Sequence, residues 1–153
     1  MVMNLIVKKI LTKDEMKNLA AVITEAEKKT SGEIRVVIRH DRQFKERKLE
    51  LHQLALKQFY SLGMEKTRDK TGVLIFILLS ERKFRIVADE GINSKVEDGT
   101  WNRIADTMMQ YFRDAKYIDG IKTAVEAVAN ELSNYFPRKS DDTNELSNEI
   151  VEH

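Results

Sequence analysis

The chain has 153 residues, of which 42% are hydrophobic, and it carries 26 Lys and Arg against 25 Asp and Glu. This length and composition predict one soluble domain with a buried core, and they exclude collagen-like and wholly disordered proteins. The net charge is close to zero, so the protein has no overall positive potential that would attract nucleic acid. The chain has no cysteine, which excludes disulfides, thiolate metal sites and cysteine nucleophiles.

The apolar runs of the sequence bear on membrane association. The longest run after the N-terminus covers residues 73–79, well below the roughly 20 residues that a helix needs to cross a bilayer. In the N-terminal stretch MVMNLIVKKILTKDE, the lysines follow the apolar residues instead of preceding them, which is not the order of a signal peptide. We therefore expect a cytoplasmic protein with no direct membrane span.

The first half of the chain predicts a helix, a strand and a second helix. Thr12 and Glu15 have the spacing of a capping box, and an apolar stripe then continues at helical period until Ser31 and Gly32, so we expect a helix over residues 13–30. Alternating side chains predict a strand over residues 33–40. A return to helical period predicts the second helix over residues 46–62.

Two adjacent runs then predict an antiparallel hairpin at the centre of the sheet. Residues 73–79 are apolar at every position, as in a strand buried on both faces, whereas residues 83–89 alternate. The three residues between these runs are short enough for a tight turn that places Leu79 opposite Lys83. This register puts Gly72 opposite Glu90.

The second half predicts two further helices and a tail. Apolar stripes run from Trp101 to Phe112 and from Ile121 to Leu132, and Pro137 ends the second stripe. Residues 138–153 are too polar to pack firmly, so we expect a disordered tail. The order of elements indicates a single α/β domain with helices on both faces of the sheet.

The hairpin predicts a cation site. Antiparallel pairing brings Asp69, before the first of its strands, to the same end as Asp89 and Glu90, after the second. A short loop allows Asp98 to join them. Carboxylates are the hard oxygen ligands that calcium and magnesium require. The alternative is that all four are solvated loop residues, with Asp98 part of a helix cap.

A second candidate site lies at the other end of the sheet. Asp41 precedes a basic stretch over residues 42–48, which either attracts a phosphate or an acidic partner or is simply a solvated face. No histidine and cysteine spacing indicates zinc, and no glycine-rich nucleotide loop or nucleophile elbow is present. We therefore expect no organic cofactor and assign no catalytic residue.

With these elements in order, the chain resembles the TPM domain family over about residues 10–137. The resemblance rests on Gly32-Glu33-Ile34, Thr71-Gly72-Val73-Leu74-Ile75, Arg82-Lys83, Gly91, Phe112-Arg113, Tyr117 and Gly120-Ile121. It implies a three-layer α/β/α sandwich with a Rossmann-like mixed sheet. Calcium binding is associated with some relatives, and acid phosphatase activity has been proposed for plant members.

The chain also departs from the pattern of that family. Family members commonly carry a leader peptide and a C-terminal membrane anchor, and we find neither in this sequence. Asp89 stands where many relatives have the first glycine of a G-x-G turn, which adds a possible ligand.

Three functions follow from these observations. The first is a TPM module that binds a divalent cation, calcium or magnesium, at Asp69, Asp89, Glu90 and Asp98 and acts through protein partners. The second is a metal-dependent acid phosphatase-like hydrolase, which needs a cationic group such as Lys70 or Lys95 to stabilise transition-state charge. The third is an interaction domain that binds no metal.

Overall fold

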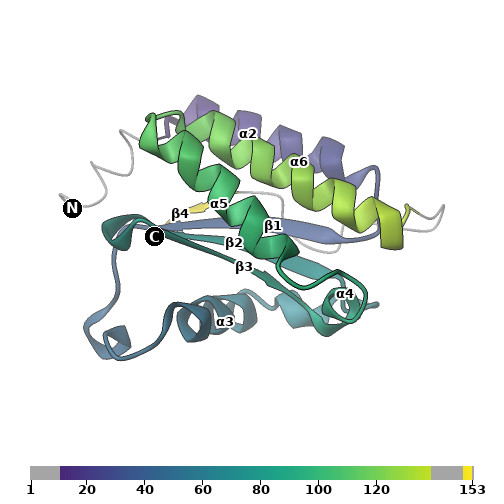
Figure 1. The fold of residues 1–153 in the computed structure, drawn as a ribbon, viewed down its shortest axis with the longest axis horizontal. Coiled ribbons are helices and arrows are strands. Elements are labelled where there is room, and N and C mark those ends of the chain that lie inside the picture. The colour runs from purple at the N-terminus through teal and green to yellow at the C-terminus, as the bar shows by residue number, and fades with distance from the viewer. Residues whose placement is uncertain (1–10, 139–149, 153) are drawn as a thin grey trace.

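The computed structural model describes residues 11–138 and 150–152, which form a mixed α/β fold (Figure 1). Its helices and strands, in chain order, are α2 (Lys13–Glu27), β1 (Glu33–Arg39), α3 (Leu51–Ser61), β2 (Gly72–Leu78), β3 (Lys83–Ala88), α4 (Glu90–Asn93), α5 (Thr100–Arg113), α6 (Tyr117–Tyr135) and β4 (Val151–Glu152). Three single turns of 3-10 helix, η1 (Phe44–Glu46), η2 (Met64–Lys66) and η3 (Leu79–Glu81), lie in the loops.

The strands form one mixed sheet in the order β3-β2-β1-β4. β1 runs parallel to β2 and to β4, whereas β2 and β3 form the antiparallel hairpin. Every residue of β2 is buried, as its unbroken apolar run predicts. The hairpin is therefore confirmed, although only β2 is central and β3 lies at the edge of the sheet.

The predicted hairpin register is wrong by one residue. Leu78 pairs with Lys83, because Leu79 leaves the strand and enters η3, and Arg82 then closes the turn with a φ of 52°. Gly72 consequently faces Asp89, whose N–H donates to the Gly72 carbonyl oxygen at 2.9 Å. The turn is longer than the sequence pattern indicates.

Helices cover both faces of this sheet. Ile34, Val36 and Ile38 of β1 pack in a core with α2, α5 and α6, while Val37 packs with α3 on the other face. Figure 1 shows α2, α5 and α6 above the sheet and α3 below it. A mixed α/β domain is thus confirmed, and its closer likeness to a Rossmann arrangement stays a prediction.

The helix boundaries follow from local contacts. The Glu15 N–H donates to Thr12 Oγ1 at 3.1 Å and the Thr12 N–H donates to Glu15 Oε1 at 3.0 Å, so the predicted capping box forms at the start of α2. The second helix begins at Leu51, five residues later than predicted, because the Glu46 side chain enters an ion pair with Arg39.

The end of the chain differs in part from the prediction of a disordered tail. Val151 and Glu152 pair with Val37 and Ile38 of β1, and the Ile150 side chain is buried. The open edge of β1 offers unpaired backbone groups to which this short strand adds. Residues 139–149 and 153 lie outside the described residues. Over the described ranges, no helix is long and apolar enough to span a bilayer.

Candidate functional site

The acidic end of the hairpin brings three of the four predicted carboxylate residues to one place in the backbone. Asp69 precedes β2, and Asp89 and Glu90 follow β3, so the antiparallel pairing sets them at the same end of the sheet. Gly91 packs tightly there: a Cβ atom on it would lie 2.5 Å from the Asp69 carbonyl oxygen and 2.6 Å from that of Lys70. Only glycine allows this approach of two backbone segments.

Only one of the two Asp89 carboxylate oxygens has a hydrogen-bond partner among the described residues. The Oδ1 atom of Asp89 accepts the Glu90 N–H at 2.8 Å and caps the short helix α4. Its Oδ2 atom is buried and has no hydrogen-bond partner among the described residues. A buried acceptor without a partner costs free energy, and a cation is one group that satisfies it.

The other predicted ligands are more exposed. The Asp69 side chain is 42% exposed, and its Oδ2 lies 3.4 Å from Nε of Arg68. Lys70 has a φ of 57° and donates from Nζ to the Glu65 carbonyl oxygen at 2.7 Å. The Lys70 ammonium group is thus held by a backbone hydrogen bond, while the Lys70 carbonyl oxygen faces Gly91.

Asp98 lies farther along the chain, in the loop between α4 and α5. It is exposed and precedes α5, whose N-cap is Gly99 with a φ of 83°. Asp98 is therefore not the cap residue of that helix. Across residues 11–138 and 150–152, no set of three or more His, Cys, Asp or Glu side chains is arranged to hold a metal ion. The cation site stays a prediction.

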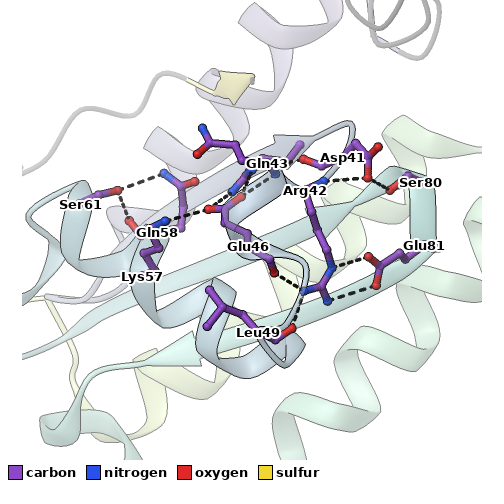
Figure 2. Close-up of polar contacts among 11 residues, drawn as sticks. Asp41, Arg42, Gln43, Glu46, Leu49, Lys57, Gln58, Ser61, Ser80 and Glu81 are labelled. Carbon is purple, nitrogen blue, oxygen red and sulfur yellow. Dashed lines mark hydrogen bonds and ion pairs between the residues drawn. The ribbon is translucent and has the colours of Figure 1, made fainter.

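The opposite end of the sheet holds a dense polar network, which we call the β1–α3 clasp and define by Arg39, Asp41, Arg42, Glu46, Lys57, Ser80 and Glu81. Figure 2 shows how Arg42 and Glu46 lie in this network. Glu46 is at its centre. Its Oε1 accepts from Arg39 Nη2 at 2.6 Å, and its Oε2 accepts from Lys57 Nζ at 3.1 Å. The Arg39 guanidinium, followed by the Gln43 N–H and Lys57, lowers the pKa of Glu46 from 4.5 to about 2.

Arg42 connects this clasp to the turn of the hairpin. Its guanidinium makes a bidentate pair with the Glu81 carboxylate, and it also donates to the carbonyl oxygens of Glu46 and Leu49. Hydrogen bonding to Arg42 lowers the pKa of Glu81. Next to it, Ser80 Oγ donates to Asp41 Oδ1 at 2.9 Å. The Arg42 N–H, with this Ser80 bond, lowers the pKa of Asp41.

These contacts show that the basic residues between 42 and 48 have different roles. Arg42 is fully engaged inside the chain, so it is a structural residue and not an open anion receptor. Lys45, Arg47 and Lys48 are exposed, and Arg47 lies over the Phe44 ring at 4.7 Å. The buried pair of Arg39 and Glu46 had no signal in the sequence, because a charged residue at an alternating strand position is ordinarily read as solvent-facing.

Comparison with known proteins gives a consistent set of similarities. The family model for the TPM domain matches residues 7–131. Among curated proteins no match is found. The BA42 protein of the psychrophilic bacterium Bizionia argentinensis is 33% identical, with a TM-score of 0.83 over 94% of this chain and 95% of that one.

Two more distant solution structures share the fold. The N-terminal domain of a protein from P. gingivalis is 22% identical, with a TM-score of 0.67 over 83% of this chain and 79% of that one. The N-terminal domain of the cg2496 protein from Corynebacterium glutamicum is 12% identical, with a TM-score of 0.59 over 84% and 78% of the two chains.

Proposed function

The chain belongs to the TPM domain family, and from that premise we propose that it is a non-enzymatic module that binds a divalent cation and acts through protein partners. We favour calcium over magnesium as the cation, and we place its site at the acidic end of the hairpin. One observation carries the proposal: Asp89 Oδ2 is buried without a partner among the described residues, beside the segment in which the carbonyl oxygens of Asp69 and Lys70 approach Gly91.

The chemistry of these groups suits calcium. Calcium takes about 6 to 8 oxygen ligands and accepts backbone carbonyls, carboxylates and water in irregular geometry. Asp69, Glu90 and Asp98 are all exposed, so their side chains can turn toward an ion at the Asp89 carboxylate. A bound cation would also offset the repulsion among these carboxylates.

The partner role has a separate support. Among the described residues, Phe44 is 81% exposed and Tyr60 is 58% exposed. Aromatic side chains are enriched at protein interfaces relative to the rest of a protein surface. Phe44 belongs to η1 and Tyr60 to α3, so both come from the segment that covers one face of the sheet.

Thermal melting with calcium or with a chelator tests the cation site. A ligand selective for the folded state adds about 2.7 kcal/mol of stability at 100 times its Kd, so millimolar calcium should raise the Tm relative to EDTA. Asp89→Asn should abolish this difference, because it removes the charge while Asn keeps the capping function of Asp. Asp106→Asn, at an exposed position on α5, should retain it.

Each alternative function predicts a different result. Equal Tm values for the natural chain in calcium and in EDTA would contradict the proposal and favour an interaction domain that binds no metal. A hydrolase instead requires cation-dependent cleavage of a phosphate ester that Asp89→Asn abolishes. Cleavage that is unaffected by Asp89→Asn indicates a contaminating activity.

A further inference from the structure

The end of the sheet away from the acidic turn contains a cavity of about 590 Å³. It lies where the hairpin turn meets the junction of α5 and α6, and it is separate from the acidic end. Its apolar wall is formed by Leu79, Phe84, Met109, Phe112 and Tyr117. Small-molecule sites are typically concave, mostly apolar and about 300–1,000 Å³ in volume, so the cavity has the size of a ligand site.

Three aromatic rings give this wall a fixed shape. The rings of Phe84 and Phe112 meet edge to face with centroids 4.9 Å apart and planes inclined at 74°. Phe112 makes a similar contact with Tyr117, at 5.0 Å and 85°. Edge-to-face contacts are favourable aromatic arrangements. The wall can therefore receive the flat apolar body of a ligand without first rearranging.

The polar lining of the cavity is basic. His40, Arg82 and Arg113 contribute to it, and no carboxylate does among the described residues. Neither Arg82 nor Arg113 pairs with an acid in the described part of the chain; Arg113 Nη2 donates to Met109 Sδ at 3.6 Å. By contrast, Arg39 and Arg42 nearby are both paired with glutamates. Nδ1 of His40 is buried without a hydrogen-bond partner among the described residues.

Two residues that line the cavity have a strained backbone. Arg82 has a φ of 52° and Ala115 a φ of 58°, and both line the cavity. Non-glycine residues in this left-handed region are unfavourable, and such residues gather at ligand-binding sites. The rim is thus held in an unfavourable conformation by the packing around it.

We infer that this cavity binds a small organic anion with an aromatic or otherwise apolar body, its carboxylate held by the guanidinium groups of Arg82 and Arg113. Guanidinium groups bind carboxylates in a planar, two-point geometry. The rings of Phe84, Phe112 and Tyr117 cover the apolar body, and His40 forms part of the remaining wall. This site does not depend on the proposed cation site.

Titration with 2-naphthoate, followed by amide NMR of the full chain, tests the inference. The expected result is saturable shifts confined to residue 40 and to residues 79–84 and 109–117. The neutral isostere 2-naphthamide should bind at least about tenfold more weakly, because it lacks the charge that the arginines recognise. Inorganic phosphate should cause no saturable shift at the same concentration, because it lacks the apolar body.

Variants identify the groups responsible. Arg82→Asn combined with Arg113→Gln should weaken 2-naphthoate at least about tenfold, and asparagine tolerates the left-handed conformation of position 82. Arg103→Gln, elsewhere on α5, and Asp89→Asn, at the acidic end, should leave the affinity unchanged. Equal Tm values confirm that the variants fold. Three results overturn the inference: no saturable shift with 2-naphthoate, equal affinity for 2-naphthamide, or full affinity in the double variant.

Discussion

Glu46 provides the sharpest test of the energetics of the fold. Its side chain is 3% exposed, and the Arg39 side chain opposite is 8% exposed. The fall in its pKa from 4.5 to about 2 corresponds to about 3 kcal/mol, at about 1.4 kcal/mol for each tenfold change in an equilibrium constant. At neutral pH, the folded chain with Glu46 ionised is therefore more stable by roughly this amount than the same chain with Glu46 protonated.

Replacing this carboxylate by an amide isolates its charge. Glu46→Gln keeps the size of the side chain but leaves the Arg39 guanidinium buried without its negative partner. Removing one member of a buried ion pair costs about 3–5 kcal/mol. Because Lys57 is 49% exposed and can turn to water, we expect the lower end, about 3 kcal/mol at pH 7.

The difference in free energy of unfolding between the natural chain and Glu46→Gln should depend on pH. The folded pKa of Glu46 lies below the unfolded one, so its contribution is present above about pH 4.5 and is lost as pH falls toward about 2. Urea denaturation at a series of pH values should show the natural chain and Glu46→Gln converging over this window. Comparing the two chains cancels the titration of other carboxyl groups.

A surface ion pair supplies the control. Glu25 pairs with Lys28, and the two side chains are 71% and 65% exposed. Exposed pairs of this kind contribute about 0–1 kcal/mol, so Glu25→Gln should change the free energy of unfolding little at any pH. The reasoning is refuted if Glu46→Gln is within about 1 kcal/mol of the natural chain at pH 7, or if the gap at pH 3 equals that at pH 7.

Two further variants test close packing and buried hydrogen bonding. Gly91→Ala would place Cβ 2.5 Å from the Asp69 carbonyl oxygen, and such overpacking costs about 1–3 kcal/mol; an unchanged Tm would contradict the close approach. Thr30→Val removes the hydroxyl that donates to the Phe136 carbonyl oxygen at 2.5 Å and accepts the Gly32 N–H at 3.1 Å. It should cost about 1–3 kcal/mol in urea denaturation, and equal stability would show that these two bonds contribute nothing.

Much of the fold could be predicted because local patterns and tertiary packing agree. The buried residues of α6 are those of its apolar stripe, including Ile121, Val125 and Leu132. The capping box at Thr12 and the unbroken apolar run of β2 also form as predicted. In each case the side chains that define the element are also the ones that pack or cap it.

The errors arise where tertiary contacts outweigh local patterns. The register of the hairpin depends on η3 and on the left-handed conformation of Arg82, neither of which a run of apolar residues encodes. The start of α3 depends on Glu46 turning back to Arg39, and the addition of β4 depends on pairing across more than a hundred residues. Periodicity alone contains no information on such distant partners.

The candidate sites were predictable to different degrees. Antiparallel pairing was enough to bring Asp69 and Asp89 to one end, but the buried Oδ2 of Asp89 could be found only from the structure. The β1–α3 clasp joins Arg42 to Glu81, 39 residues away in sequence. The basic cavity likewise brings His40, which follows β1, together with residues of the hairpin turn and of the α5–α6 junction, and no linear motif connects them.

The most direct test of the central claim is a calcium titration followed by amide NMR of the natural chain and of Asp89→Asn. We predict that residues 69–72 and 89–98 shift together and saturate in the natural chain, and that these shifts disappear in the variant. The account is contradicted if no amide in these two segments changes at millimolar calcium, or if the variant responds as the natural chain does.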